Sequence, residues 1–140
     1  MKKMLVKFND GSELKVKLYE DKTPESIKML EASCPQEVKW MHARFNGEAV
    51  FFTADIKGDV PAENAKAGND MKAGEISLWR GGHELFMDKA VHFWYGPKVA
   101  GANPENVIGE FDGDMKALND FGMKVWIDGP CKAVISVIEE

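Results

Sequence analysis

The chain has 140 residues, of which 44% are apolar and 29% are charged, and its formal net charge is −5. This length fits one compact domain over residues 1–140, because two domains of half that size would each bury too little apolar surface. The acidic charge balance argues against a nucleic-acid partner, which would require a basic surface. No apolar run approaches the ~20 residues of a membrane-spanning helix, so no membrane partner is expected.

The start of the chain and its cysteines bear on localisation. Residues 1–7 hold three lysines around a very short apolar stretch, which is not the pattern of a secretory signal. Cys34 and Cys131 lie far apart and belong to no metal-binding or redox motif. We therefore expect a cytoplasmic protein with two reduced thiols, each a small apolar filler rather than a nucleophile.

The first part of the chain predicts a hairpin followed by a helix. Residues 5–8 and 14–19 are strand-like stretches on either side of an Asp-Gly turn, which is typical of a hairpin. Thr23 suits the N-cap of a helix, and Pro24 suits its first position, where the missing N–H costs nothing. Pro35 then ends the helix.

The middle of the chain predicts a second hairpin and a long loop. Residues 38–52 contain two strand-like stretches that meet at Asn46-Gly47, a strong hairpin signal. Residues 55–73 are rich in Gly, Asn and Asp and show little apolar periodicity, so we expect a loop of a length that is often functional.

Further strands are predicted at 74–80, 85–87, 90–95 and 107–111. The third of these carries few charges on either face, which is typical of a buried central strand. The stretch 96–106 is rich in Gly, Pro and Asn, and we expect it to be a loop.

The C-terminal part predicts a helix and a closing strand. Asp114 precedes the clearest helical pattern of the sequence, and the strand follows at 132–138. The helix face that we expect to cover one end of a sheet holds Met115, Leu118, Gly122 and Val125, with Trp126 beside it. About eight strands, two helices and no alternation of strand and helix predict an all-β domain, either an antiparallel barrel or a sandwich.

The candidate site residues gather in one part of the sequence. All three histidines, both arginines and three of the four tryptophans lie between Trp40 and Tyr95. Tryptophan offers a stacking surface, and arginine donates a paired hydrogen bond to carboxylate, so we predict a pocket for a small anionic or aromatic ligand. Its expected ligand-binding residues are Trp40, Phe51, Trp79, Arg80, His83, His92, Trp94 and Tyr95. Since strand residues two apart share a face, His42 and Arg44 would lie beside Trp40, and these two are the candidate catalytic residues.

Other interpretations stay open. A tryptophan on a strand usually belongs to the core, and a lone arginine usually lies on the surface. The three histidines lack a tight ligand spacing, so no metal is expected. The sequence has no phosphate-binding loop, dinucleotide fingerprint or nucleophile elbow, so no cofactor is expected either.

Five segments, in their order and spacing, resemble an uncharacterised family of small bacterial and archaeal proteins with a cyclophilin-like fold. These segments are 23–27, 42–52, 74–79, 91–96 and 106–111. The resemblance implies a closed, eight-stranded antiparallel barrel with a helix at each end. True cyclophilins isomerise the peptide bond before proline with an arginine of a Phe-His-Arg run and a Gln-Gly-Gly further along. This chain has Met41-His42-Ala43-Arg44 and no Gln-Gly-Gly, so the resemblance implies the fold more than an activity.

Three classes of function follow from these observations. The first is a binding module for a small anionic or aromatic ligand. The second is an enzyme, either a residual peptidyl-prolyl isomerase or a small lyase or hydrolase, with His42 as general base and Arg44 as electrostatic stabiliser. The third is a homo-oligomer in which the aromatic patch is the interface between copies.

Overall fold

A computed structural model describes residues 1–43, 47–81, 89–99 and 103–140, and for residues 97–99 it describes the backbone alone. The described strands form one antiparallel sheet, in the order β2-β1-β9-β3-β4-β7-β6-β8-β5. Because β2 also pairs with β8, eight of these strands close into a barrel, and β5 lies outside the closed circuit. The predicted eight-stranded antiparallel barrel is therefore confirmed. The strands are β1 (Lys2–Phe8), β2 (Glu13–Leu18), β3 (Gln36–His42), β4 (Gly47–Thr53), β5 (Ala65–Ala67), β6 (Glu75–Trp79), β7 (Ala90–Val99), β8 (Pro104–Phe111) and β9 (Cys131–Glu139).

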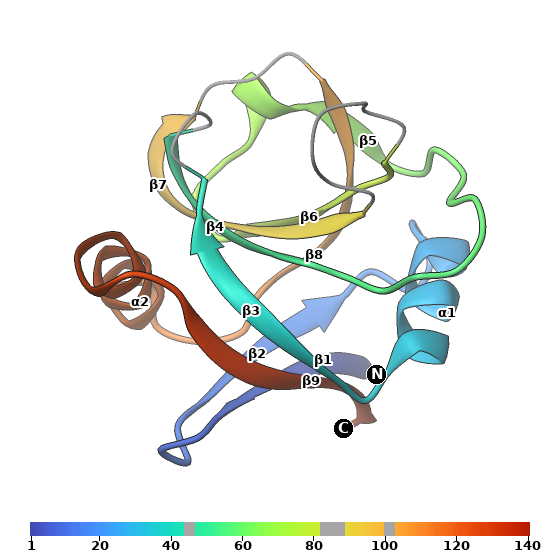
Figure 1. Ribbon diagram of the computed structural model, residues 1–140. Coiled ribbons are helices and arrows are strands. Elements are labelled where there is room, and N and C mark those ends of the chain that lie inside the picture. Colours follow the sequence, from blue (N-terminus) through green and yellow to red (C-terminus); the bar gives the residue numbers. More distant parts are fainter. Residues whose placement is uncertain (44–46, 82–88, 100–102) are drawn as a thin grey trace.

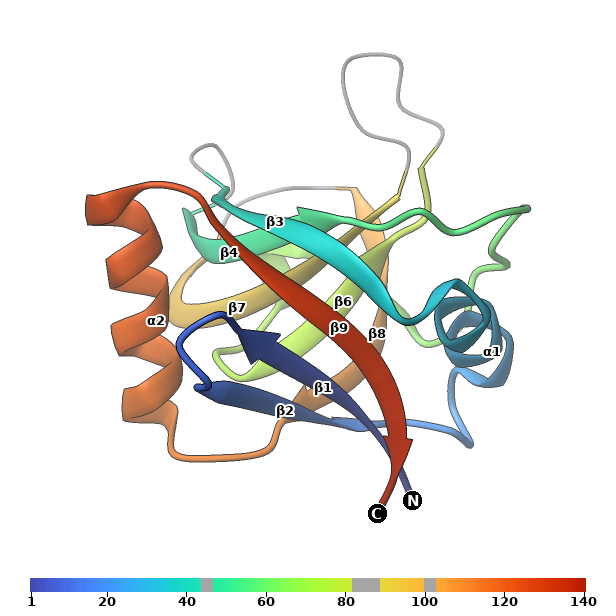
Figure 2. The ribbon, with the colours of Figure 1, turned by 60° about the horizontal axis from the view of Figure 1, so that its bottom comes forward.

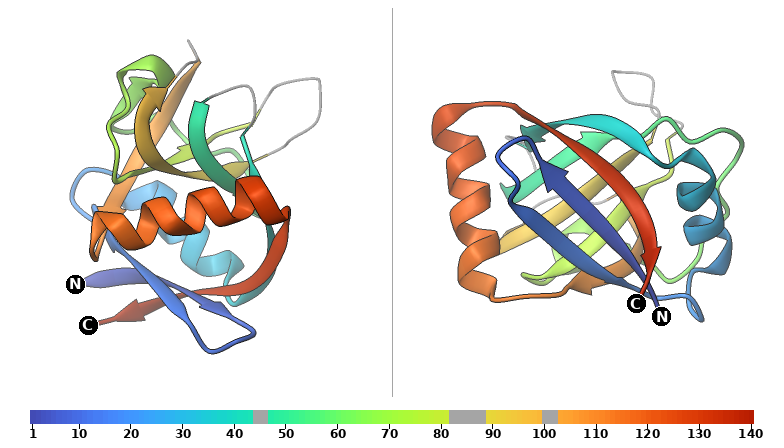
Figure 3. Two further views of the ribbon diagram at one scale, coloured as in Figure 1. Left: turned by 90° about the vertical axis from the view of Figure 1, so that its left-hand side faces the viewer. Right: turned by 90° about the horizontal axis from the view of Figure 1, so that it is seen from below.

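Two helices, α1 (Pro24–Ser33) and α2 (Met115–Asp128), lie on opposite sides of the barrel (Figure 2 and the right view of Figure 3). The side chain of Asp114 accepts a hydrogen bond from the Lys116 amide at 3.0 Å, which caps α2 as predicted. Among the described residues, neither helix is long and apolar enough to cross a membrane.

The N-terminus of α1 is capped from elsewhere in the chain. Pro24 opens the helix as predicted, but Thr23 makes no capping hydrogen bond with its side chain, which instead donates to the Tyr19 carbonyl at 3.0 Å. The carboxylate of Glu63 accepts from the Ser26 amide at 2.7 Å and from the Glu25 amide at 3.2 Å. The side chain of Glu63, from the loop before β5, therefore caps α1 in place of the predicted Thr23 side chain.

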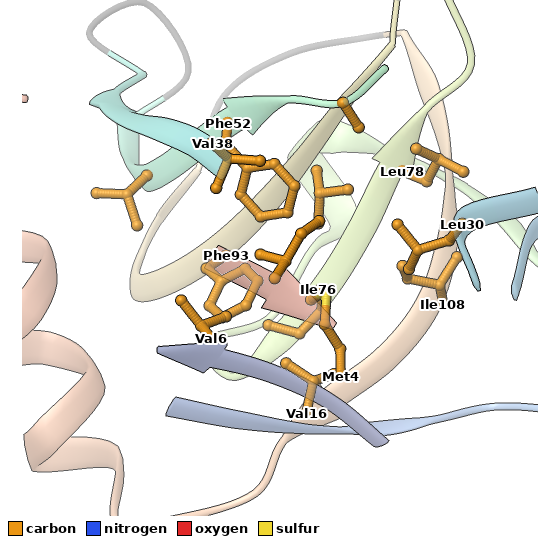
Figure 4. Close-up of a cluster of buried hydrophobic side chains, with 14 of the residues drawn as sticks. Met4, Val6, Val16, Leu30, Val38, Phe52, Ile76, Leu78, Phe93 and Ile108 are labelled. Carbon is orange, nitrogen blue, oxygen red and sulfur yellow. The ribbon is translucent and has the colours of Figure 1, made fainter. Parts of the chain in front are cut away.

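The barrel interior is the main hydrophobic core (Figure 4). Met4 and Val16 face Phe93 and Ile76 across it, and Leu30 of α1 closes one end. Met4 and Val6 of β1, like Ile76 and Leu78 of β6, are two residues apart and belong to the same core, as the period of two requires. The helix face of α2 is narrower than predicted, since Leu118, Gly122 and Val125 are buried while Met115 and Trp126 are exposed.

Two predicted loops contain strand structure. The predicted loop 96–106 is wrong in part, because β7 continues to Val99 and β8 already begins at Pro104. Gly47 pairs with Val99 beyond a register shift in β4, so pairing between strands extends β7 through a segment of low strand propensity. Within 55–73, the short β5 pairs with β8. The predicted strand 85–87 lies outside the described residues.

A second, smaller core lies on the outer face of the barrel wall. It is separate from the barrel interior, and Figure 1 shows β5 and the ends of β7 and β8 curving beyond β6, on the side away from β1, β2 and β9. We call it the outer cluster. Its buried members are Ala43, Ala49, Phe51, Met71, Ala90, Trp94 and Val107, and Tyr19, Met41 and Trp79 pack against them.

Candidate functional site

One row of paired residues crosses the outer face through four strands. Met41 of β3 pairs with Phe51 of β4, Phe51 pairs with His92 of β7, and His92 pairs with Ser77 of β6. Paired residues of neighbouring antiparallel strands point to the same face, so these side chains lie side by side on the outer wall. Trp94, two residues beyond His92, points to that face as well.

A buried chain of hydrogen bonds links this row to β8. The indole Nε1 of Trp94 donates to Ser77 Oγ at 2.8 Å, and Ser77 Oγ donates to Glu105 Oε1 at 2.9 Å. Because an indole N–H can only donate, the Ser77 hydroxyl accepts from Trp94 and donates its own hydrogen bond to Glu105. The Glu105 oxygen is therefore the acceptor at the end of this chain of hydrogen bonds.

His92 lies against the same carboxylate. Its Nδ1 is 3.0 Å from Glu105 Oε1, and the two side chains are 2% and 6% exposed. The oxygen lies off the direction of a well-formed hydrogen bond from the ring, so the contact is chiefly electrostatic. His92 Nε2 has no hydrogen-bond partner among the described residues. A buried imidazole beside a buried carboxylate, with no well-formed hydrogen bond at either ring nitrogen among the described residues, leaves a polar group that a ligand could satisfy.

Two aromatic rings hold the imidazole in place. The centroid of His92 is 5.2 Å from that of Phe51 and 5.5 Å from that of Trp94, and both ring pairs are stacked. The three side chains are buried, so this flat aromatic array around one polar nitrogen is accessible only after a local opening. It can stack a planar molecule and exchange one hydrogen bond with it.

A second polar arrangement lies on the inner face, under α2. His42 Nε2 and Tyr95 Oη are 2.5 Å apart, and the ring of Trp126 lies 4.7 Å from that of His42. Burial lowers the pKa of His42, and the carboxylate of Glu48 partly offsets this effect. Burial, with a smaller contribution from Glu48, raises the pKa of Tyr95. Both groups are therefore neutral near pH 7.

The structure divides the predicted site residues between the two faces. Phe51, His92 and Trp94 come together in the outer cluster, and Trp79 packs against it. Trp40, His42 and Tyr95 belong to the inner face, so the described residues do not form one pocket that contains all the predicted members. The predicted residues Arg44 and His83 lie outside the described residues.

Trp40 and Arg80 have contacts that are structural. The Trp40 indole makes edge-on contacts with Phe52, Phe93 and Phe121 at centroid distances of 4.8, 4.8 and 5.2 Å, so it is a core residue. Arg80 donates from Nη1 to the Val60 carbonyl at 3.2 Å, which holds the loop before β5.

Sequence reasoning did not find Ser77 and Glu105. Neither belongs to a motif, and Glu105 falls in the segment that was expected to be a loop. Ser77 lies on the outer face because it pairs with His92, and a register shift between Ile76 and Ser77 sets it opposite Val107, two residues from Glu105. This pairing places the Ser77 hydroxyl next to the Glu105 carboxylate. It cannot be predicted from the residues adjacent to either one in the sequence.

Metal and thiol chemistry receive no support from the described residues. They contain no group of three or more His, Cys, Asp or Glu side chains that could hold a metal ion. Cys34 and Cys131 are both free, and burial raises the pKa of each thiol. A raised pKa leaves less of the reactive thiolate at neutral pH.

A shallow groove of about 520 Å³ lies apart from both arrangements. It runs between the β1–β2 turn and α2, and Phe8, Leu14 and Phe121 are among its lining residues. None of the predicted site residues lines it.

The closed barrel with its two helices is a cyclophilin-like fold. A cyclophilin-type peptidyl-prolyl cis-trans isomerase of Cryptosporidium parvum, solved in the presence of the dipeptide Ala-Pro, is similar to this chain. The TM-score is 0.57 and the identity 13%, and 99% of each chain is covered. The chain belongs to the family described as "Protein of unknown function (DUF3830)", whose model matches residues 8–137. No curated protein matches the sequence.

Two further solved structures share the fold. McbB, solved in complex with tryptophan, has a TM-score of 0.74 and 16% identity, and the match covers 95% of this chain. The chain spans only 44% of the length of McbB. The hypothetical protein AF2241 from Archaeoglobus fulgidus has a TM-score of 0.65 and 22% identity, with 96% of this chain and 92% of that chain covered.

Proposed function

We propose that this protein binds a small molecule with a planar aromatic ring in the outer cluster. The observation that carries the proposal is the imidazole of His92, which is buried between two stacked aromatic rings and keeps Nε2 without a partner among the described residues. A ring of the ligand would stack on this aromatic surface, and one polar atom would hydrogen bond to Nε2.

The Glu105 carboxylate affects whether Nε2 of His92 accepts or donates a hydrogen bond to the ligand. The Glu105 carboxylate, 3.0 Å from Nδ1, favours the neutral tautomer with its proton on Nδ1, in which Nε2 is an acceptor. In the other neutral tautomer, the same nitrogen is a donor that can bind a carboxylate. A neutral aromatic amide and an aromatic carboxylate are therefore both candidate ligands.

Two neighbours in fold support a small-ligand function in general terms. McbB was solved with tryptophan and the Cryptosporidium protein in the presence of a dipeptide. At 16% and 13% identity these likenesses concern the fold, so the proposal depends on the residues of this chain. Because its site side chains are nearly fully buried, binding requires a local opening, and we expect slow association.

The three histidines allow a direct test by NMR. Protein labelled at histidine Cε1 is titrated with benzamide, with benzoate and with cyclohexanecarboxamide, which has the size of benzamide but no aromatic ring. We expect benzamide or benzoate to shift the His92 signal saturably, and the saturated amide to leave it unchanged. Equal binding of the saturated amide would contradict the proposed stacking.

Two neighbouring phenylalanines provide matched variants. Phe51 lies in the outer cluster and Phe52 in the barrel core, on opposite faces of the same strand. Phe51→Leu should weaken binding about tenfold by removing the stacked ring, whereas Phe52→Leu should lower stability with little effect on affinity. If Phe51→Leu folds and binds as the wild type does, the proposed site is wrong.

A second candidate function is an enzyme with His42 as general base. Burial holds the imidazole neutral, and the Tyr95 hydroxyl fixes its orientation, which are both requirements of a base. Arg44, the proposed electrostatic stabiliser, lies outside the described residues. The standard proline-peptide assay at micromolar protein, with His42→Gln as control, tests the isomerase version. No acceleration by the wild-type protein would exclude it.

A further inference from the structure

Four side chains gather where β3, β4 and β7 pass beneath the second half of α2. We call them the mouth cluster, and they are His42, Glu48, Tyr95 and Trp126. His42 pairs with Val50 across β3 and β4, and Glu48 lies two residues before Val50 on the same strand. The cluster lies on the inner face of the barrel wall, so it is separate from the outer cluster and its proposed function.

His42 is held at one nitrogen and unpartnered at the other. Nε2 lies 2.5 Å from the Tyr95 hydroxyl. Nδ1 is buried and has no hydrogen-bond partner among the described residues. Burial keeps the pKa of His42 below its ordinary value, so the ring is neutral near pH 7. A neutral, oriented imidazole with one unused nitrogen leaves room for one hydrogen bond from a ligand.

The carboxylate of Glu48 sits against the backbone at Gly96. A Cβ atom at position 96 would lie only 1.9 Å from Glu48 Oε2, so glycine is required for the carboxylate to occupy this place. In the part of the chain that the structure describes, Glu48 forms no hydrogen bond and no ion pair. Its charge nevertheless favours a higher pKa for both His42 and Tyr95. A half-buried carboxylate beside two neutral groups attracts a cation.

Trp126 supplies the aromatic side of the cluster. Its side chain is 56% exposed, although its ring lies 4.7 Å from that of His42. Gly122, one turn earlier in α2, lets the Tyr95 ring approach the helix, since a Cβ there would be 2.3 Å from Tyr95 Cδ1. The close approach of helix and strand brings an exposed indole next to the imidazole and the carboxylate.

We propose that the mouth cluster is a binding site for a small aromatic amine carrying a protonated nitrogen. The ammonium group would pair with Glu48 and lie within reach of His42 Nδ1, and the ring of the ligand would pack on Trp126. The carboxylate would repel a ligand of the same shape with an anionic group.

The test compares two probes that share a phenyl ring and differ in charge. The full chain is titrated by calorimetry with 2-phenylethylamine and with 3-phenylpropionate at low and at high salt. We expect saturable binding of the amine, weaker at high salt because the ion pair is partly screened, and no binding of the propionate at this site. Glu48→Gln and Trp126→Leu should each weaken amine binding about tenfold, and Trp126→Phe should restore part of it.

Two controls separate this site from its surroundings. Ile127, beside Trp126, is 72% exposed, so Ile127→Ala should leave amine binding unchanged. Phe51→Leu should also leave it unchanged, because that residue belongs to the outer cluster. Equal affinity for the two probes in the Phe51→Leu variant, where the outer cluster is impaired, or unaltered amine binding by folded Glu48→Gln, would overturn the proposal. The absence of saturable amine binding up to about 10 mM would also overturn the proposal, because a lower affinity is too weak for specific recognition.

Discussion

Glu105 and Asn106 are neighbours in β8, yet their side chains stabilise different parts of the protein. Glu105 accepts a hydrogen bond from Ser77 at 2.9 Å in the outer cluster. Asn106 donates to Ser26 of α1 at 3.0 Å and to the Pro61 carbonyl at 2.9 Å. Alternation along a strand sends successive side chains to opposite faces, so one short segment positions both the candidate site and α1.

Removing the Glu105 carboxylate should strongly destabilise the protein. Glu105→Ala would leave the Ser77 hydroxyl buried without its acceptor and would remove the charge beside His92, at a cost of about 3 kcal/mol in the free energy of unfolding. Glu105→Gln keeps an oxygen for Ser77, so we expect a loss of only about 1 kcal/mol. Urea denaturation followed by circular dichroism measures both values.

The exposed Glu110 of the same strand provides the control for Glu105. Glu110→Ala should change the free energy of unfolding by less than about 0.5 kcal/mol. If Glu105→Ala proves no more harmful than this control, the buried contact with His92 does not stabilise the outer cluster.

A methyl group at Gly122 should separate α2 from the barrel. The new Cβ would lie 2.3 Å from the Tyr95 ring, and such overpacking costs about 2 kcal/mol. The higher helix propensity of alanine returns about 1 kcal/mol of this. Thermal unfolding of Gly122→Ala should therefore show a lowered midpoint. Combining it with Tyr95→Leu should recover part of the loss, and simple additivity of the two changes would contradict the proposed clash.

Much of the fold could be predicted because its signals are local. The Asp-Gly turn, Pro24 at the start of α1 and Asp114 at the start of α2 each specify the conformation of a few adjacent residues. The extension of β7 and the existence of β5 depend on pairing with β4 and β8, which are distant in the sequence. Tertiary pairing overrides weak strand propensity, and one sequence read locally cannot show it.

The candidate site could be predicted only in part, for a related reason. Alternation correctly placed His92 and Trp94 on one face, because both belong to one strand. Alternation could not show that Trp40 of β3 points into the barrel while His92 of β7 points to its outer face. Ser77 reaches Glu105 through a register shift between strands, which leaves no pattern in either segment.

Glu63 should make stability depend on acid pH. Burial of its carboxylate raises the pKa, but hydrogen bonds from Ser26 and Glu25 outweigh burial and hold the pKa below its ordinary 4.5. A group whose pKa is lower in the folded state stabilises the fold fully above its unfolded pKa, and this contribution is lost as the pH falls through the folded value. The stability difference between the wild type and Glu63→Gln should be largest near neutral pH and shrink below about pH 4.5.

Urea denaturation between neutral pH and about pH 3 measures this difference. The exposed Glu13→Gln in β2 is the matched control, and it should not reproduce the pH-dependent loss seen with Glu63→Gln. A constant difference for Glu63→Gln across the range would show that its carboxylate does not cap α1 in solution.

His42 should titrate below its ordinary pKa of 6.5, because burial disfavours the charged imidazolium. Between the folded and unfolded pKa values the unfolded chain binds more protons, so stability is complete above about pH 6.5 and falls as the pH drops through this interval. Glu48 raises the pKa of His42, so Glu48→Gln should lower it further. Histidine-selective NMR measures both titrations, with the exposed Glu37→Gln as a control that should leave the pKa of His42 unchanged. A His42 that titrates above 6.5 would show that burial does not dominate its pKa, and one that is insensitive to Glu48→Gln would show that the carboxylate and the imidazole do not share the mouth cluster.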